Sequence, residues 1–296
     1  RTWVNQYATP ALGMHRADLH TLLRQQLPPN CIHLNCNFKR YEQVGQKVCV
    51  SFENGSSIEC DGLIGADGIH SNVRQQLQGN TPPRYHGYPI WRGVTHTVPP
   101  GFHHEEIWGT YGTGQQFGGC AIGSDRIYWF ALVNRPEQDP EMMDDQKSLL
   151  LDRFGNWHEP IPDLIAATNQ TDILRHNTYD CRPNSRWGEG NVTLLGDAAH
   201  LMAPTYGQGA CQALEDALVL SRCVAQNSTL SAAFRQYEQC RFPWVAKLQQ
   251  LSHQLGSVMQ WQNPLLAQLR NASLSILPDG WSDYLTGINA VFGHQA

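Results

Sequence analysis

Two segments of the chain place an aspartate beside a glycine directly after a short apolar run. The first run, Leu63 to Ala66, ends at Asp67-Gly68, and the second, Val192 to Leu195, ends at Gly196-Asp197. Ligands of α/β sheets bind at the carboxyl ends of strands, where glycine lets the backbone come close and a carboxylate can accept hydrogen bonds from hydroxyl groups. We therefore expect Asp67 and Asp197 to lie close together at the edge of one ligand-binding groove.

A glycine-rich segment follows the second aspartate and leads into a long helix. Gly207-Gln208-Gly209 precedes a helix that we expect from Ala210 to about Val224. The N-terminus of this helix offers free N–H groups and a partial positive charge to a ligand. A tight turn explains either Asp-Gly pair alone, but both pairs together with this segment favour a binding site. The apolar spacing predicts an inner helix face made of Ala213, Ala217, Leu220, Val224, Leu214 and Leu218.

The elements before the first aspartate follow from apolar spacing and turn residues. Residues Lys47 to Phe52 alternate in polarity, and Asn54-Gly55 predicts a hairpin after them. A helix is expected from Arg16 to Leu27, and another from Asn72 to Leu77 with Ser71 as its N-cap.

The residue pattern between Pro82 and Pro183 differs from that of the segments before and after it. Short β-like segments alternate with glycine and aromatic residues, and one helix is expected from Met142 to Phe154. This pattern indicates a mixed antiparallel sheet with a helix. Mostly helical segments follow from Ser231 to Met259, with a kink or break near Pro243, and then from residue 264 to about 274.

Composition narrows the class of protein. The 296 residues suit two domains, and 41% hydrophobic with 16% charged residues is an ordinary balance for a globular protein. A net charge of −5 argues against nucleic acid as a partner, and no apolar run approaches the roughly 18–20 residues of a membrane span. Nine cysteines without a CxxC pair indicate reduced thiols, so a cytoplasmic protein is expected.

Several segments match the motifs of one enzyme family, in the family's order. Residues 65–74, Gly-Ala-Asp-Gly-Ile-His-Ser-Asn-Val-Arg, resemble its second FAD motif, and residues 196–217, which open with Gly-Asp-Ala-Ala-His, resemble its third. His15 to Leu19 resembles a segment that opens a helix beside FAD, and Trp91-Arg92-Gly93 resembles the strand that enters the substrate domain. The chain thus resembles the FAD-dependent monooxygenases of the para-hydroxybenzoate hydroxylase type.

The resemblance implies FAD as the cofactor and NAD(P)H as the co-substrate. Asp197 would bind ribityl or pyrophosphate oxygens, Asp67 would lie near the pyrophosphate, and Arg16 would contact FAD from its ribose–phosphate side. The backbone from Gly207 to Cys211 would face the pyrimidine edge of the flavin, where a helix N-terminus stabilises the negative charge of the reduced ring. The expected cofactor-binding residues are Arg16, Asp67, Gly68, Gly196, Asp197, Pro204, Gly207, Gln208, Gly209, Ala210 and Cys211.

The resemblance also implies an α/β fold, with an incomplete Rossmann-like FAD-binding domain, an inserted mixed β-sheet substrate domain and C-terminal helices. The FAD-binding domain would comprise residues 1–81 and 184–230, the substrate domain residues 82–183, and the C-terminal helices residues 231–296. The inserted sheet would cover a pocket for a small-molecule substrate. The residues expected to line that pocket are Trp91, Arg92, Phe117, Met202 and Pro204.

The implied reaction is a hydroxylation or epoxidation that uses O2. NAD(P)H reduces FAD, and a flavin C4a-hydroperoxide delivers one oxygen atom to an aromatic or unsaturated small molecule. This route needs no protein nucleophile, acid or base. We therefore expect His200 to be a packing or hydrogen-bonding residue, Glu215 and Asp216 to be helix-surface or structural groups, and Cys211 to be a small buried residue.

No metal site is expected. His103-His104-Glu105-Glu106 does not have the HExxH spacing of a zinc site, and a solvated polar loop is the better explanation.

The sequence departs from the family pattern at two places. Position 211 is Cys where many relatives carry Asn, and no GxGxxG turn is present. The nearest match, which begins at Gly112, has Phe117 at its last position. Since the first residue is Arg1, we expect a chain that lacks the first strand–helix unit and that binds FAD poorly by itself. Two alternatives stay open: a related FAD-dependent reductase or halogenase, and a truncated, FAD-free protein without enzymatic activity.

Overall fold

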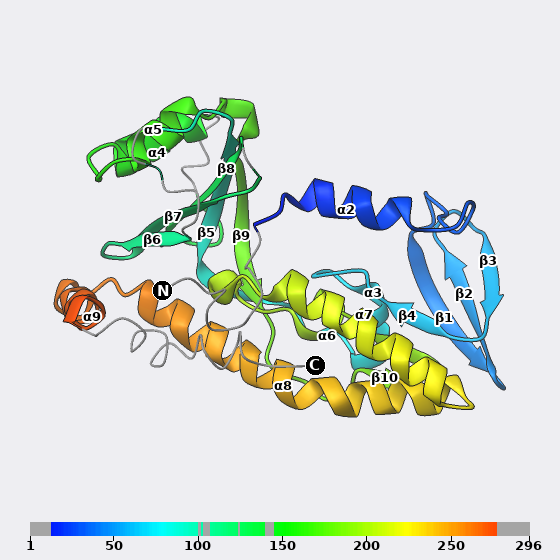
Figure 1. Cartoon of the computed structure of the whole chain (residues 1–296). Helices are drawn as coiled ribbons and strands as arrows, with labels where there is room; N and C mark the ends of the chain where they lie inside the picture. Colours follow the sequence, from blue (N-terminus) through cyan, green and yellow to red (C-terminus); the bar gives the residue numbers. More distant parts are fainter. Residues whose placement is uncertain (1–12, 100–101, 103–106, 124, 140–144, 277–296) are drawn as a thin grey trace. The chain divides into compact units, whose positions relative to one another are not determined.

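The computed structural model describes residues 13–99, 102, 107–123, 125–139 and 145–276 (Figure 1). The chain divides into two compact units. Unit 1 comprises Arg1–Pro28, Gly87–Thr178 and Ser257–Ser282, and unit 2 comprises Pro29–His86, Tyr179–Gly256 and Asp283–Ala296. The polar segment 103–106 lies outside the described residues. None of the helices in the described ranges has the length and apolar character that crossing a membrane requires.

Unit 2 contains an antiparallel sheet of three strands in the order β1-β2-β3. The strands are β1 (Phe38–Val44), β2 (Lys47–Phe52) and β3 (Ser57–Cys60). Gly55, in the turn between β2 and β3, has a φ of +84°, a conformation that glycine adopts without steric cost. The hairpin expected at Asn54-Gly55 is therefore confirmed.

A second sheet in unit 2 has the order β10-β11-β4. Its strands are β10 (Gly188–Glu189), β11 (Val192–Leu194) and β4 (Leu63–Gly65), and β11 runs parallel to β4. The helix α3 (Asn72–Gln78) follows β4, and the short helix α6 (Asp197–His200) follows β11. The backbone N–H of Arg74 donates to Ser71 Oγ at 2.9 Å, so the expected N-cap of α3 is confirmed.

Two long helices follow α6, namely α7 (Gly209–Gln226) and α8 (Leu230–Met259). Helix α8 runs unbroken through Pro243. Of the residues expected on the inner face of α7, only Leu220 is buried, so the rest of that prediction is wrong. The buried residues of α7 are Gln212, Asp216, Leu220 and Cys223, whereas Leu214 and Leu218 are 45% and 48% exposed. The face was misassigned because polar side chains of α7 are buried against charged partners, which apolar spacing does not register.

Unit 1 is built on a five-stranded sheet in the order β6-β7-β8-β5-β9. The strands are β5 (Arg84–Thr95), β6 (Trp108–Tyr111), β7 (Gln115–Ala121), β8 (Ile127–Val133) and β9 (Leu174–Asp180). Helices α4 (Gln146–Phe154) and α5 (Ile161–Ala167) pack on one face and close a core around Trp91, Phe117 and Trp129 (Figure 1). The unit also contains α2 (Arg16–Gln25) and α9 (Pro264–Ile276).

Glycine makes room for Trp129 in this core. A Cβ atom on Gly93 of β5 would lie 2.3 Å from Cζ2 of Trp129. The indole is fully buried, and its Nε1 donates to Thr168 Oγ1 at 2.8 Å. The indole ring of Trp129 therefore packs directly against the backbone of Gly93 and is held by a hydrogen bond. A side chain at position 93 must displace this ring.

We predict that Gly93→Ala lowers the free energy of unfolding by about 1–3 kcal/mol, because overpacking forces Trp129 from its position. Gly109→Ala in β6 of the same sheet is the matched control, since the nearest atom to its added Cβ would be 3.6 Å away. Urea unfolding followed by tryptophan fluorescence measures both variants. Equal midpoints would contradict the close fit at Gly93.

Candidate functional site

The two aspartate turns lie at the same edge of one sheet in unit 2. Strands β4 and β11 pair in parallel, with Gly65 opposite Leu194, and the N–H of Leu195 donates to Gly65 O at 3.0 Å. Asp67 and Asp197 each follow the carboxyl end of one of these strands. The expectation that these two turns meet at one sheet edge is confirmed.

One arginine ties the two turns together. The side chain of Arg74 is buried, and its Nη1 donates to the carbonyl oxygens of Asp197 and Ala198 at 3.2 and 3.0 Å. Its Nη2 donates to Ile69 O at 2.5 Å. The sequence motif alone did not predict this role of Arg74. Its place seven residues after Asp67, on the helix that follows the first turn, was the available signal.

The carboxylate of Asp67 is engaged by its own helix. It accepts hydrogen bonds from Ser71 Oγ and from the backbone N–H groups of Asn72 and Val73, at 2.5, 2.8 and 3.2 Å. These contacts leave little acceptor capacity for a ligand. Gly68 next to it has a φ of +76°, and among the described residues other than its chain neighbours no atom lies within 4 Å of where its Cβ would be. The Asp67 turn therefore offers a ligand mainly backbone and open space.

The carboxylate of Asp197 is available. The side chain is exposed, and within the part of the chain that the structure describes no hydrogen bond or ion pair engages it. Its Oδ1 lies 3.7 Å from the point where Gly209 would carry a Cβ. Since Gly209 is the first residue of α7, a free carboxylate stands beside the N-terminus of an 18-residue helix, where N–H groups and a partial positive charge are presented.

The segment between Asp197 and α7 is anchored on α8. Leu201 O accepts from Gln249 Nε2 at 3.0 Å, and Thr205 Oγ1 donates to Ser252 O at 3.0 Å. Gly207 closes the segment in the left-handed region, with a φ of +65°. Among the residues expected to bind a cofactor here, Pro204, Gly207, Ala210 and Cys211 are exposed, Gly209 is half-buried, and Gly196 and Gln208 are buried.

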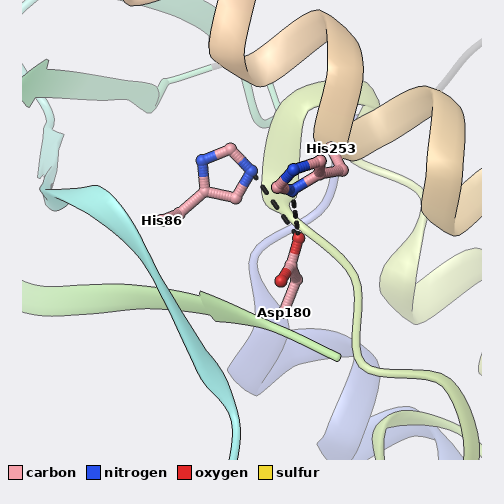
Figure 2. Close-up of side chains that lie close together, drawn as sticks. All are labelled: His86, Asp180 and His253. Carbon is pink, nitrogen blue, oxygen red and sulfur yellow. Dashed lines mark hydrogen bonds and ion pairs between the residues drawn. The ribbon is translucent and has the colours of Figure 1, made fainter. Parts of the chain in front are cut away.

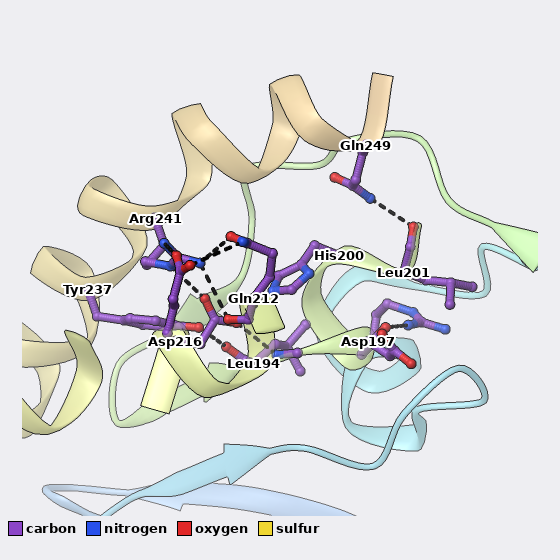
Figure 3. A network of polar contacts seen from close by, with 12 residues as sticks. Leu194, Asp197, His200, Leu201, Gln212, Asp216, Tyr237, Arg241 and Gln249 are labelled. Atoms are coloured by element: carbon purple, nitrogen blue, oxygen red, sulfur yellow. Dashed lines mark hydrogen bonds and ion pairs between the residues drawn. The ribbon is translucent and has the colours of Figure 1, made fainter. Parts of the chain in front are cut away.

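A buried polar network holds the residues next to Asp197 in place (Figure 3). The carboxylate of Asp216 on α7 is fully buried, and it accepts from the N–H of Gly196 at 3.0 Å, from His200 Nε2 at 2.5 Å and from Arg241 Nε at 2.8 Å. Arg241 also donates to Glu215 Oε2 at 2.8 Å and to Gln212 Oε1 at 2.7 Å. The structural role expected for His200, Glu215 and Asp216 is confirmed, but a surface position for Asp216 is wrong.

The charges in this network are compensated. Burial alone would raise the pKa of Asp216, but the hydrogen bond from His200 and the charge of Arg241 hold it below its usual range. Nδ1 of His200 is buried without a hydrogen-bond partner among the described residues.

Cys211 is exposed, so the expectation of a buried residue is wrong. Neighbouring atoms nevertheless shield its thiol in part from solvent, and this partial desolvation together with the charge of Glu215 raises the pKa of Cys211. A raised pKa disfavours the thiolate, which is the reactive form. A redox role for Cys211 has no support in this environment.

A second polar cluster in unit 2 joins three elements (Figure 2). His86 on β5, Asp180 on β9 and His253 on α8 point toward one another, and His253 Nδ1 lies 2.8 Å from Asp180 Oδ2. Arg84 donates to both carboxylate oxygens of Asp180, at 2.7 and 3.1 Å. A metal ion bound there would stand beside a guanidinium that already neutralises Asp180, so the cluster is better explained as an ion-paired group within unit 2.

The remaining residues predicted to bind substrate or cofactor lie in different parts of the two units. Trp91 and Phe117 lie in the core of unit 1, Arg92 is half-buried on β5, and Arg16 is exposed on α2. Met202 is buried in unit 2. The structure does not test their contacts with a substrate or cofactor, so these roles stay predictions.

Comparisons with known proteins agree on one family. A family model described as an FAD binding domain matches residues 35–252. Aurachin C monooxygenase/isomerase from Stigmatella aurantiaca is 34% identical over 287 residues, which cover 97% of this chain and 74% of that protein. Chloroplastic zeaxanthin epoxidase from an Oncidium hybrid cultivar is 37% identical over 206 residues, or 70% of this chain, and the match spans only 31% of the epoxidase.

Solved structures of HpxO from Klebsiella pneumoniae share the fold. A variant complexed with FAD superimposes with a TM-score of 0.91 at 29% identity, covering 98% of this chain and 76% of that chain. A complex with FAD and uric acid gives a TM-score of 0.82 at 32% identity, covering 88% of this chain and 67% of that chain.

We predict that Asp216→Asn lowers the free energy of unfolding at pH 7 by up to about 3–5 kcal/mol, because the buried charge of Arg241 loses its fully buried carboxylate partner and keeps only that of Glu215. Glu215→Gln should have a much smaller effect, since the side chain of Glu215 is 29% exposed. Urea unfolding of the two variants checks this. A loss for Glu215→Gln as large as that for Asp216→Asn would contradict the central place of Asp216.

The acid dependence of stability gives a separate prediction. Because the pKa of Asp216 is lower in the folded state than in the unfolded state, its contribution is complete above the unfolded value of about 3.9 and is lost as pH falls through the folded value. The stability difference between the wild-type protein and Asp216→Asn should therefore shrink below about pH 4. Unfolding measured between neutral and acid pH tests the sign, and a difference that grows on acidification would refute it.

Proposed function

Because this chain belongs to the family of class A FAD-dependent monooxygenases, we propose that it holds FAD where β4 and β11 end. The observation that carries the proposal is the parallel pairing of these strands. It places the Asp67 turn, the Asp197 carboxylate and the N-terminus of α7 at one sheet edge in unit 2.

The residues at this edge suit FAD. Asp197 has a carboxylate without a protein partner in the described ranges, and such a group can accept hydrogen bonds from the ribityl hydroxyls. The space beside Gly68 and the backbone of its turn suit a close approach by the pyrophosphate. The first N–H groups of α7 suit the pyrimidine edge of the flavin, which carries negative charge after reduction.

When bound, FAD supplies the redox chemistry, taking electrons from NAD(P)H and activating O2. The protein supplies position and electrostatics. Arg74 and Asp216 hold the two turns in register, so the groups that face the cofactor need not rearrange when charge develops. No side chain of the described site is needed as a general acid or base, which fits the structural roles of His200 and Asp216.

The substrate is proposed to be a small conjugated organic molecule that is hydroxylated or epoxidised. The relatives' names support this class: one is a zeaxanthin epoxidase, another an aurachin C monooxygenase/isomerase, and HpxO is seen with uric acid. An epoxidase and a monooxygenase each insert one oxygen atom into an organic molecule. The proposal goes no further than this shared chemistry.

We predict that Asp197→Ala weakens FAD binding by roughly ten- to a hundredfold, since a charge-assisted hydrogen bond contributes about 1.5–3 kcal/mol. Glu59→Ala is the control, because Glu59 is an exposed carboxylate on β3 of the same unit. Flavin content after purification and fluorescence titration with FAD measure both variants. Equal affinities would show that Asp197 does not face the cofactor.

A further inference from the structure

The carboxylate of Asp180 is the centre of the second polar cluster of unit 2 (Figure 2). Only 2% of its side chain is exposed, and Arg84 donates to both of its oxygens. His253 Nδ1 lies 2.8 Å from Asp180 Oδ2, and His86 Nε2 lies 3.7 Å from the same oxygen. Three groups that can carry a positive charge therefore surround one buried negative charge.

A proton on His86 is disfavoured by these surroundings. Its side chain is 2% exposed, and its ring centroid is 4.9 Å from that of His253. Burial is the largest cause that lowers the pKa of His86. The charge of Asp180 on β9 opposes this shift, whereas the charges of His253 on α8 and Arg84 on β5 add to it. His86 is therefore neutral at pH 7, and a proton that it takes up at lower pH adds a charge that Asp180 no longer balances.

The residue after Asp180 holds one end of the segment 201–207, which leads to α7. The N–H of Cys181 donates to Leu201 O at 3.1 Å. Gln249 Nε2 donates to the same oxygen at 3.0 Å and to Cys181 O at 3.3 Å (Figure 3). A displacement of Asp180 therefore reaches the backbone of Leu201 through a single hydrogen bond.

The residue before His253 holds the middle of the same segment. Thr205 Oγ1 donates to Ser252 O at 3.0 Å. Residues 204–206 form one short 3-10 helix, so this bond fixes the whole turn. The segment 201–207 is thus attached on both sides to peptide groups that adjoin the charged cluster.

We propose that the cluster of Arg84, His86, Asp180 and His253 is a proton-sensitive support for the segment 201–207, so that protonation of His86 loosens this segment and weakens FAD binding. The loosening concerns unit 2 alone. The effect on FAD rests on the proposed function, which places the cofactor beside this segment.

The sign of the effect follows from the lowered pKa of His86. The loosened form, in which the ring meets water, binds the proton more readily than the intact cluster does. The support is therefore complete above the unperturbed value of about 6.5 and is lost as the pH falls from there through the folded value. Asp216 titrates in a more acidic range, because its pKa is lowered from 3.8.

The first test measures amide hydrogen exchange in peptides that cover residues 179–183 and 201–207. At about pH 5.5 the protection of both peptides in the wild-type protein should be up to about tenfold lower than at about pH 7.5, after correction for the intrinsic effect of pH. His86→Gln cannot take up the proton and should keep its protection at both pH values. His96→Gln is the matched control and should respond like the wild type, since the His96 side chain is 72% exposed.

His253→Gln decides the question if His86→Gln does not fold. The charge of His253 is one of the causes that keep the pKa of His86 low, so its removal should move the loss of protection to higher pH. An unchanged transition in His253→Gln would contradict the proposal. Protection that does not respond to acid in the wild type would overturn it. A response that survives His86→Gln would also overturn it, because another group such as His200 would then be the one that titrates.

The second test is FAD titration of the wild type, His86→Gln and His96→Gln at the same two pH values. The affinity of the wild type and of His96→Gln should fall by up to about tenfold on acidification, and that of His86→Gln should stay constant. FAD binding that does not respond to pH would overturn the coupling proposed here. Absence of FAD binding at either pH would instead contradict the proposed function, because the hydrogen-exchange result does not depend on the cofactor.

Discussion

The carboxylate of Asp216 is the point on which the arrangement of unit 2 depends. It is fully buried, and it receives the N–H of Gly196, the imidazole of His200 and the guanidinium of Arg241. One group thereby connects the turn after β11 to α6, α7 and α8. Burying a carboxylate is unfavourable unless its partners compensate it, so the three donors together stabilise the packing of these four elements. The position of Asp197, one residue after Gly196, follows from this constraint.

Arg74 applies a similar constraint from the other side of the sheet edge. Its guanidinium has no carboxylate partner among the described residues. It donates hydrogen bonds to three backbone carbonyl oxygens of the two turns. Because these acceptors are backbone oxygens, Arg74 holds the two turns in position without engaging the carboxylate of Asp197. The result is a site in which the buried charges are occupied and the exposed carboxylate is left for a ligand.

The sequence was informative where local chemistry determines the structure. The hairpin at Asn54-Gly55 and the cap at Ser71 depend on a few adjacent residues, and both are present. The parallel meeting of the Asp67 and Asp197 turns followed from their common form. The buried face of α7 could not be predicted in this way, because Asp216 is buried by Arg241, which lies 25 residues later in the sequence. The exposed position of Cys211 was missed for the same reason: helix burial depends on neighbours that are distant in sequence.

Asp67 and Asp197 both follow a short strand, but their carboxylates have different surroundings. The difference lies in the residues that follow each aspartate. After Asp67 the chain reaches Ser71 and the N-terminus of α3 within a few residues, so the carboxylate turns back to cap that helix. Helix α6 begins at Asp197 itself, and α7 begins only at Gly209. The acceptors of Asp197 therefore stay free while the N-terminus of α7 is brought beside them. A strand end followed by Asp and Gly does not by itself define a ligand contact, since the carboxylate of Asp67 is engaged by the helix that follows it.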